Sequence, residues 1–539
     1  MSPFPFRGVL LLLAAMAAAQ QTAFEDRSAG AGITAVLRHH PTPEKHQIET
    51  MPGGVAAFDF DNDGKTDLYF TNGAPQPALR KTPEDCNRLY RNLGGWRFED
   101  VTARAGVCGE GYSMGAATAD FDNDGFADLF VAGVNRNALY RNRGDGTFED
   151  VTAKAGVANR GQWAVAAGWF DYDNDGWLDL FVVNYVKWDP RTEPFCGDAK
   201  AGYRSYCHPK FYEGLPNVLY RNNGDGTFRD VSAQTGIGKH IGKGMGIAFA
   251  DLSGDGHMDV LVANDTTPNF LFRNRGKGVL EETGFAAGVA MNDDGRALSS
   301  MGVDFRPMRG LLPDLFITAL ANETFPLYRN RDGSSFSDAT YASQIGRATM
   351  AYSGWGAGIY DFDNDGRKDI FAACGDVQTN TEVYSSRKSR QANLLLLANP
   401  DGTFAAQEVG KPAWHRGAAF ADFDSDGRVD IVVTRLGETP LLLRNTMGEG
   451  NHWIAFQLRG KESNRDGIGA RVRVVTADGE QWNHASTSVG YASSSAKVVH
   501  FGLGPKAEVR AVEILWPSGK KTKLSAPAAD RVHGVDELP

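Results

Sequence analysis

Cysteine, basic charge and long apolar runs are all in short supply in this 539-residue chain. It has five cysteines, and its 56 lysines and arginines are outnumbered by 66 aspartates and glutamates, for a formal charge of −10. Nucleic-acid-binding surfaces need an excess of basic charge, so we expect no nucleic-acid partner. Beyond the N-terminal segment, no stretch reaches the roughly 18 consecutive apolar residues of a membrane helix, and we expect no membrane span.

Several familiar catalytic motifs are also missing. The sequence holds no HExxH zinc motif, no P-loop and no CxxC pair. We therefore predict no catalytic residues and no organic-cofactor site, and a binding protein is favoured over an enzyme.

The N-terminus has the pattern of a secretory signal peptide over residues 1–19. Arg7 supplies a positive charge, Val9–Ala19 is apolar, and Ala17–Ala19 offers small residues for cleavage before Gln20. We expect export to the periplasm or the extracellular space, followed by removal of this segment.

The five cysteines suit an oxidising compartment. Cys196 and Cys207 lie in one long insertion and are a candidate disulfide. Cys86 and Cys108 flank a predicted hairpin and form a second candidate pair. Cys374 lies in an apolar strand, where a buried and inert thiol is expected.

One short acidic phrase occurs six times and is the most informative feature of the sequence. Each copy places oxygen-bearing side chains at positions 1, 3, 5 and 9, and glycine at position 6. Ca²⁺ takes roughly six to eight oxygen ligands, and a loop that turns sharply at glycine lets alternate side chains converge on one point. The copies are DFDNDGKTDL (59–68), DFDNDGFADL (120–129), DYDNDGWLDL (171–180), DLSGDGHMDV (251–260), DFDNDGRKDI (361–370) and DFDSDGRVDI (422–431).

The predicted calcium ligands are the side chains at positions 1, 3, 5 and 9 and the backbone carbonyl at position 7. They are Asp59, Asp61, Asp63, Lys65 and Asp67; Asp120, Asp122, Asp124, Phe126 and Asp128; Asp171, Asp173, Asp175, Trp177 and Asp179; Asp251, Ser253, Asp255, His257 and Asp259; Asp361, Asp363, Asp365, Arg367 and Asp369; Asp422, Asp424, Asp426, Arg428 and Asp430.

A single phrase of this kind is usually only a turn, because Asp, Asn and Gly are common turn residues. Six copies with a fourth carboxylate at a fixed offset favour metal binding, and we expect about six Ca²⁺ ions per chain. The copy with Ser253 lacks one carboxylate and should be the weakest site. An EF-hand would need glutamate at position 12, but that position lies in an apolar β-like run in every copy, so the loops join strands.

Each acidic phrase belongs to a longer repeat of four short strands. One strand precedes the phrase, a second follows it, a third resembles NRLYRN (87–92), and a fourth resembles GDGTFEDVT (144–152). Repeats of this kind are typical of propeller blades. Met301–Thr318 has the same outline without the acids, with Arg306 at position 3, its guanidinium in place of a cation, and Met308 at position 5. The repeats therefore predict seven blades.

The last repeat lacks its fourth strand. After LLLRN (441–445) no such strand appears, whereas FEDRSAGAGI at Phe24–Ile33 matches FEDVTARAGV at Phe98–Val107. The N-terminal segment is therefore predicted to complete the seventh blade and close the ring.

Two insertions interrupt the repeats between second and third strands. Residues 186–216 are rich in aromatic side chains, and residues 376–391 are polar. Long loops on a rigid scaffold often carry binding sites. The alternative is that the aromatic side chains form a small core beneath the Cys196–Cys207 disulfide, and both interpretations stay open.

From about residue 450 the repeats stop. Alternating strands joined by Gly, Asp and Ser turns predict a compact β-sandwich. His452, His484 and His500 are isolated there, and structural roles are expected for all three.

These features together resemble the cartilage acidic protein-like family of secreted FG-GAP/VCBS-repeat propellers with a C-terminal UnbV/ASPIC domain. The series NHW…SNRDGIGARV…HFGLG…WPSG (451–519) resembles that domain, and residues 24–445 resemble the propeller. The prediction is thus an all-β chain, with a seven-bladed β-propeller bearing calcium loops over 24–445 and a small β-sandwich domain over 450–539. The resemblance implies a secreted or surface protein with adhesion or matrix roles.

We therefore predict a secreted, monomeric calcium-binding propeller that acts as a binding, adhesion or scaffold module for an extracellular glycan or protein. The alternative is a calcium-dependent polysaccharide lyase, because related calcium-bearing propellers include such enzymes. A lyase needs a base beside a cation, and the candidates are His39, His40, Lys45, Tyr206 and His208.

Overall fold

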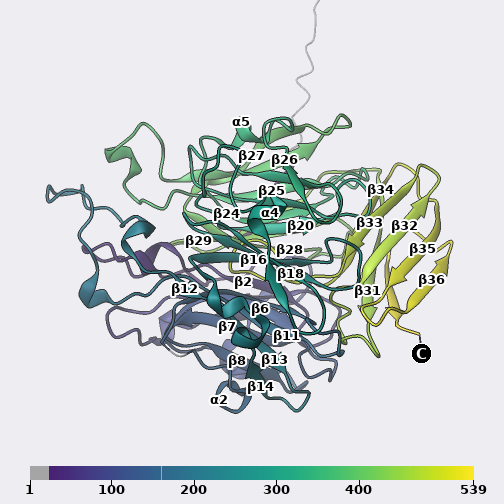
Figure 1. Ribbon diagram of the computed structural model, residues 1–539, viewed down its shortest axis with the longest axis horizontal. Helices are drawn as coiled ribbons and strands as arrows, with labels where there is room; N and C mark the ends of the chain where they lie inside the picture. Colours follow the sequence, from purple (N-terminus) through teal and green to yellow (C-terminus); the bar gives the residue numbers. More distant parts are fainter. Residues whose placement is uncertain (1–22, 160, 539) are drawn as a thin grey trace, which may run out of the picture.

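The computed structural model describes residues 23–159 and 161–538, and the predicted signal peptide lies outside these residues. Seven four-stranded antiparallel sheets make up most of the chain. The innermost strand of each sheet lies beside that of the next, and the last lies beside the first, so the sheets form a closed ring (Figure 1). This arrangement is a β-propeller, as predicted.

Each blade runs from an inner strand at the ring centre to an outer strand at the rim. In this order the blades are β2 (Val55–Phe58), β3 (Asp67–Phe70), β4 (Arg88–Asn92) and β5 (Phe98–Asp100); β6 (Tyr112–Ala119), β7 (Asp128–Val134), β8 (Ala138–Asn142) and β9 (Phe148–Asp150); β10 (Ala164–Phe170), β11 (Asp179–Asn184), β13 (Val218–Asn222) and β14 (Phe228–Asp230); β16 (Gly244–Ala250), β17 (Asp259–Asn264), β18 (Phe270–Asn274) and β19 (Leu280–Glu282); β20 (Val303–Arg306), β21 (Asp314–Ile317), β22 (Leu327–Asn330) and β23 (Phe336–Asp338); β24 (Gly354–Tyr360), β25 (Asp369–Cys374), β26 (Gln391–Ala398) and β27 (Phe404–Ala413); β28 (His415–Ala421), β29 (Asp430–Arg435), β30 (Leu441–Asn445) and β1 (Phe24–Asp26).

Short helices and one small ribbon lie in the connections. They are α1 (Thr102–Ala105), α2 (Thr152–Ala155), α3 (Ser232–Thr235), α4 (Gly284–Ala287) and α5 (Ile345–Thr349); the 3₁₀ turns η1 (Gln47–Thr50), η2 (Pro83–Asp85), η3 (Pro190–Thr192), η4 (Pro209–Phe211), η5 (Ile237–Lys239) and η6 (Thr381–Val383); and the pair β12 (Leu215–Pro216) and β15 (Ile241–Gly242).

The N-terminus supplies the outer strand of the last blade. β1 pairs antiparallel with β30, with Phe24 opposite Asn445 and Asp26 opposite Leu443. The closure predicted from the match at Phe24–Ile33 is therefore confirmed. It also covers the edge of β30, which would otherwise offer unpaired backbone groups to another chain.

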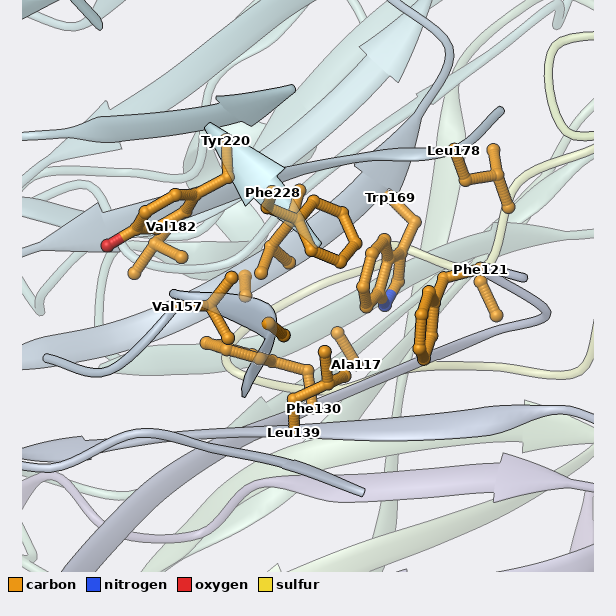
Figure 2. Packing of buried hydrophobic residues seen from close by; sticks show 14 of the residues in the cluster. Ala117, Phe121, Phe130, Leu139, Val157, Trp169, Leu178, Val182, Tyr220 and Phe228 are labelled. Carbon is orange, nitrogen blue, oxygen red and sulfur yellow. The ribbon is translucent and has the colours of Figure 1, made fainter. Parts of the chain in front are cut away.

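Large apolar side chains join neighbouring blades. Between the second and third blades, Phe121 and Trp169 stack with ring centroids 6.0 Å apart, and Phe228 packs against both (Figure 2). Phe121 is position 2 of its acidic phrase and is buried. The position-2 residues of the other phrases are also buried: Phe60, Tyr172, Leu252, Phe362 and Phe423. The phrase thus contributes to the core as well as to the loop.

A buried carboxylate and a buried amide link five of the six acidic loops to the preceding blade, whereas in the sixth blade Asp369 accepts the N–H of Ala398. At position 9, Asp128 accepts the backbone N–H of Phe121 at 3.1 Å and that of Asn142 at 2.7 Å. The Asn142 side chain donates to the Phe60 carbonyl of the preceding blade at 2.8 Å. In the described residues the same cross-blade amide comes from Asn92, Asn142, Asn222, Asn274, Asn330 and Asn445.

The fifth blade corrects the predicted place of Arg306. Arg306 lies opposite Asp314 in the strand ladder, where Phe58 lies opposite Asp67 in the first blade. Arg306 therefore precedes position 1, and its assignment to position 3 was wrong, because the connection is one residue shorter than in the first blade. Asp314 instead forms an ion pair with Arg329, whose Nη1 lies 2.6 Å from its carboxylate.

Two facing sheets form the C-terminal domain, coloured yellow in Figure 1, as predicted. Their strands, in spatial order, are β34 (Val499–Gly504), β31 (His452–Arg459) and β37 (Val532–Asp536); and β33 (Glu480–His484), β32 (Arg471–Thr476), β35 (Val509–Leu515) and β36 (Lys521–Ser525). None of the helices in the described residues has the length and apolar character needed to cross a membrane.

A loop of this domain enters the centre of the ring. Residues 486–495, between β33 and β34, are buried among the inner strands of the propeller. The Ser494 N–H donates to the Val55 carbonyl at 2.9 Å, and the Gly490 N–H donates to the Val303 carbonyl at 2.8 Å. A Cβ atom on Gly490, whose φ is +77°, would lie 2.6 Å from the Ala357 carbonyl oxygen. Only glycine fits this close approach.

Removing the N-terminal strand should damage the whole propeller. A protein that begins at Thr34 should unfold at a lower temperature than one that begins at Ala23, and should aggregate, because β30 becomes an exposed edge. Calorimetry and light scattering measure both effects. The point variant Glu25→Ala, at an exposed position of β1, is the control and should behave like the parent. An unchanged midpoint in a monomeric truncated protein would contradict the closure.

Loss of one cross-blade amide should be costly. The Asn222 side chain donates to the Phe121 and Leu178 carbonyls and accepts the Gly224 N–H. Asn222→Ala leaves these buried groups unpaired, so the free energy of unfolding should fall by about 3 kcal/mol. Denaturant titration gives this value, and Asn223→Ala, at the exposed neighbouring residue, should change it little.

Candidate functional site

The structure brings carboxylates together in five of the six acidic loops. In each of the five, oxygen atoms of three aspartates lie within 4.8 Å of one another. The groups are Asp59, Asp61 and Asp67; Asp120, Asp122 and Asp128; Asp171, Asp173 and Asp179; Asp361, Asp363 and Asp365; Asp422, Asp424 and Asp430. Oxygen-only ligand sets of this kind suit hard cations such as Ca²⁺.

Two left-handed residues bend the backbone of these loops. The position-6 glycines have φ between +84° and +96°. Position 4 also has a positive φ, and it is asparagine in four of the loops, a residue that tolerates this conformation. The position-4 amide then links neighbouring loops, since Asn62 donates to the Gly125 carbonyl at 3.0 Å and Asn123 to the Gly176 carbonyl at 3.1 Å.

Some carboxylate oxygens in these loops have no donor within the described residues. At position 1, Asp59 accepts the N–H groups of Asp63 at 3.1 Å and Gly64 at 2.9 Å. At position 3, a buried oxygen accepts no hydrogen bond in three loops: Asp61 Oδ1, Asp173 Oδ1 and Asp424 Oδ1. A buried and unpaired carboxylate oxygen is unfavourable, and a divalent cation between positions 1, 3 and 9 would satisfy it. The residues present therefore fit Ca²⁺.

The arginine of the third strand (Arg91 in β4) contacts the acidic loop, and sequence reasoning missed it. Arg91 lies 2.6 Å from Asp61 and 3.0 Å from Asp63. Equivalent pairs of contacts to positions 3 and 5 come from Arg141, Arg221 and Arg444. The guanidinium fixes the outer carboxylate oxygens in place. The recurrence of arginine at one place in the third strand was the signal that could have revealed it.

Burial raises the pKa of the innermost carboxyl groups. The pKa of Asp67 is raised to about 8, and the pKa values of Asp120 and Asp171 to about 7, in each case chiefly through desolvation. Nearby aspartates add to the rise because like charges disfavour ionisation. A bound cation has the opposite effect, so metal binding at these loops should release protons.

The fourth loop meets an arginine from the C-terminal domain. Its acids are not among the carboxylate clusters of the described residues. Arg471 Nη1 lies 3.4 Å from Asp251 Oδ2, and Arg471 Nη2 donates to the Gly254 carbonyl at 3.4 Å. Ser253 offers no carboxylate at position 3. The guanidinium therefore supplies positive charge in a loop with fewer acids.

Other contacts also place the C-terminal domain on the acidic loops. Asp466 accepts the Asp120 N–H at 2.8 Å, and His500 Nε2 lies 3.0 Å from the Gly427 carbonyl. His484 Nε2 lies 3.1 Å from Arg306 Nη1. His500 and His484 thus make contacts between the domains, whereas His452 Nδ1 lies 2.7 Å from Asp530 within the C-terminal domain.

The two insertions, residues 186–216 and 376–391, meet each other and are here called the cap. Gln378 exchanges two hydrogen bonds with the Tyr206 backbone, at 2.8 and 2.9 Å. The Arg204 Nε donates to the Glu44 carbonyl at 2.9 Å, which ties the cap to the N-terminal connection. Cys196 and Cys207 form a disulfide within the cap, as do Cys86 and Cys108 in the first blade, whereas Cys374 is buried and free. Both predicted disulfides are confirmed.

A cavity of about 240 Å³ lies beneath the cap. Met51, Met245, Met301 and Trp355 line it and pack in one cluster with Tyr491 of the inserted loop. The polar lining comes from the cap, from η1 and from turns after second strands. It includes Gln47, Tyr185, Tyr206, His208, Asp265, Asp376 and Arg387. Phe195 and Phe211 of the cap are exposed, so the cap aromatics do not all form a closed core.

The five candidate bases for a lyase are placed differently from one another. Tyr206 and His208 line the cavity, but the Tyr206 hydroxyl donates to Glu49 at 3.0 Å. Lys45 donates to Thr379 at 2.5 Å. His40 pairs with Asp85 at 2.8 Å, and burial lowers the pKa of His39 to about 4.

One sequence that matches a hydrolase motif letter by letter is the GYSMG of residues 111–115. In a hydrolase, the serine of G-x-S-x-G lies on a sharp strand-to-helix turn with its hydroxyl exposed. Ser113 is buried within β6, and its N–H donates to the Asn72 carbonyl at 3.1 Å. This serine is a strand residue rather than a nucleophile.

Comparison with known families agrees with the geometry in both parts of the chain. Residues 59–131, 120–182 and 212–262 match the FG-GAP-like repeat, and residues 460–538 match ASPIC and UnbV. The chain thus contains FG-GAP-like repeats and a C-terminal segment that matches ASPIC and UnbV. The carboxylates of the first four loops lie in the matched repeats, and Arg471 and the inserted loop lie in the matched C-terminal domain.

Curated relatives match over most of the chain. The chain is 26% identical to cartilage acidic protein 1 of Xenopus tropicalis over 479 residues, which cover 87% of this chain and 61% of the relative. It is 25% identical to cartilage acidic protein 1 of Homo sapiens over 513 residues, with 90% and 71% covered. The chain thus spans about three fifths of the frog protein.

Solved structures resemble the chain only loosely. A lectin from Agrocybe aegerita that recognises non-reducing terminal N-acetylglucosamine matches with a TM-score of 0.36 and 16% identity, over 72% of this chain and 87% of the lectin. The Dos1 propeller matches with a TM-score of 0.37 and 9% identity, over 70% and 74%. At these scores, neither match bears on the ligand.

Arg471 should exclude metal from the fourth loop. The double variant Ser253→Asp, Arg471→Met should bind about one more Ca²⁺ per chain than the parent, because it restores the carboxylate and removes the competing guanidinium. Metal analysis of the dialysed proteins gives the count. Ser253→Asp alone is the matched control and should gain none. A full extra ion in that single variant would show that Arg471 does not compete.

Proposed function

We propose that this protein is a secreted, calcium-binding β-propeller that serves as a binding or scaffold module for an extracellular glycan or protein. The observation that carries the calcium assignment is the convergence of three carboxylates in each of five loops. The unpaired position-3 oxygens support it independently. Two disulfides in the chain are consistent with an oxidising compartment.

The proposed role of calcium is structural. The acidic loops lie against the C-terminal domain, and their position-9 carboxylates are buried beside the core. An ion there neutralises carboxylates that otherwise repel one another, and its ligands belong to both strands that flank the loop. The ions therefore stiffen the blades and are not expected to contact the ligand.

The cap is the proposed recognition surface. It is formed by long loops on a rigid ring, and it covers a cavity of about 240 Å³ at the end of the ring away from the acidic loops. The lyase alternative is less well supported. Of its candidate bases, the one hydroxyl that lines the cavity donates to Glu49, and no described acidic loop is among the lining residues.

Calcium should raise thermal stability and bind at about five sites per chain. The unfolding midpoint should increase with free calcium and fall on chelation, because the ion binds the folded state selectively. Asp173→Asn should lose about one ion, whereas Asp225→Asn, in an exposed turn of the same blade, should lose none. Calorimetry and metal analysis provide the data. A midpoint unaffected by chelation would mean that the loops are only turns.

The binding role is tested separately. The calcium-loaded protein should retain ligands from a glycan array or from native extracellular material. Release of unsaturated uronic-acid products from polysaccharides by the purified protein would instead establish the lyase.

A further inference from the structure

The cap carries an excess of positive charge on a protein whose formal charge is −10. Its two insertions hold eight lysines and arginines and six aspartates and glutamates. Two of these six acids turn inward. Asp376 is 6% exposed, and Glu193 accepts the Trp188 indole N–H and the Tyr212 hydroxyl. The outer face of the cap, meaning the exposed side chains of both insertions, is therefore basic.

Acids of the described residues neutralise only half of these cations. Four form ion pairs with carboxylates, and they are Lys187, Arg191, Arg387 and Arg390. The other four form no ion pair within the described part of the chain, and they are Lys200, Arg204, Lys210 and Lys388. The three lysines among these four are exposed. Exposed charge that no acid neutralises attracts ligands of the opposite sign.

Aromatic rings lie beside these cations on the outer face. Phe195 is 65% exposed, and the Arg204 guanidinium lies 4.0 Å from its ring centroid. Lys200 Nζ lies 4.4 Å from the ring centroid of Tyr203. Tyr384 of the second insertion is 48% exposed and packs against Tyr203, with ring centroids 5.7 Å apart. Rings and cations from both insertions thus share one surface.

The cap backbone holds this surface in place. The Arg204 guanidinium donates to three backbone carbonyls, those of Glu44, Pro194 and Cys196. Carbonyl groups fix the guanidinium without cancelling its charge. The Tyr384 hydroxyl donates to a backbone carbonyl of the first insertion, and the Cys196–Cys207 disulfide closes that insertion. Side chains that are already ordered lose little conformational entropy when a ligand binds.

The outer face suits a sugar polymer better than a peptide or a folded protein. Extended peptides usually bind along a sheet edge or in a groove for a helix. Within the described residues of the cap, β12 is the one strand and already pairs with β15, and η3, η4 and η6 have three residues each. Lysine is depleted in interfaces between proteins, whereas three of the four unpaired cations here are lysines.

From this surface we propose that the outer face of the cap binds an acidic polysaccharide, a sugar polymer that carries carboxylate or sulfate groups. The exposed ring faces pack on the C–H groups of the sugars, and the unpaired lysines and Arg204 meet the anionic groups. A neutral sugar would use the rings alone and leave the charges unused. The inference rests on the proposed binding role and narrows its ligand to this class.

The test measures binding to the full calcium-loaded protein by isothermal titration calorimetry, after dialysis against buffer without free calcium. The probes are hexasaccharides of hyaluronan, which carry carboxylates, hexasaccharides of heparin, which also carry sulfates, and neutral maltohexaose. We expect the two acidic sugars to bind, more weakly as the salt concentration rises, and maltohexaose not to bind. Tighter binding of the heparin sugar assigns the surface to sulfated polymers, and the reverse order assigns it to polymers of uronic acids.

Charge variants locate the binding surface. The double variant Lys200→Gln, Lys388→Gln should weaken binding of the acidic sugars by at least about tenfold, because it removes two unpaired charges from the outer face. The double variant Lys461→Gln, Lys521→Gln removes the same charge from exposed positions of the C-terminal domain. It is the matched control and should leave the affinity unchanged.

A ring variant tests the aromatic part of the surface separately. Phe195→Ala should weaken binding of the acidic sugars by at least about threefold, because it removes one ring face. Phe285→Ala is the matched control, since Phe285 of α4 is also 65% exposed but lies outside the cap. All these side chains are exposed, so the variants should keep the unfolding midpoint of the parent.

Three results would overturn the proposal. They are binding of maltohexaose as tight as that of the acidic sugars, an equal loss of affinity in the two double lysine variants, and binding of polyglutamate or of phosphatidylserine vesicles as tight as that of the sugars. The last result would make the cap a surface for acidic peptides or for anionic membranes. If a ligand found on the glycan array or in native material still binds the Lys200→Gln, Lys388→Gln protein normally, the binding role stands and only this assignment fails.

Discussion

The buried carboxylate at position 9 of the acidic phrase is the group on which the rest of the structure depends. Asp128 ends one loop, begins a strand, and accepts backbone N–H groups from Phe121 and Asn142. Through Asn142 it is linked to the preceding blade at Phe60. One of the proposed metal ligands therefore also joins the acidic phrase to the third strand and, through Asn142, to the preceding blade. The same hydrogen-bond arrangement recurs around the ring and joins successive blades.

Much of the propeller could be predicted because its signals are local. Three short motifs each indicate the structure of their own residues: the acidic phrase, the third-strand motif and the FED match at Phe24. Each of them forms the loop or strand that was predicted for it. The place of Arg306 in the repeat could not be predicted from such motifs. The connection between β20 and β21 is one residue shorter than in the first blade, which shifts the numbering of the loop positions without changing the pattern of strands. Arg471 meets Asp251 only through tertiary packing. The loop at residues 486–495 is rich in small residues and has no periodic pattern, so its burial in the ring could not be predicted from the sequence.

The two ends of the ring have different chemistry. At one end, aspartates face the C-terminal domain, and Arg471 adds a cation where Ser253 leaves a carboxylate out. At the other end, the cap covers a cavity lined by methionines, Trp355 and several polar side chains. The proposed calcium loops and the proposed recognition surface thus lie at separate ends of the ring, so the cap could vary in sequence without disturbing the acidic loops.

The loop at residues 486–495 determines whether small molecules can pass along the axis of the propeller. An open propeller has an axial passage that joins its two ends, whereas here Tyr491 and its neighbours fill that passage. The cavity beneath the cap is therefore closed on the side of the ring centre. A molecule that enters it from the cap side must also leave on the cap side. Exchange with the surroundings is then controlled by the cap alone, and the residence time of an occupant becomes a property of two loops rather than of the whole ring.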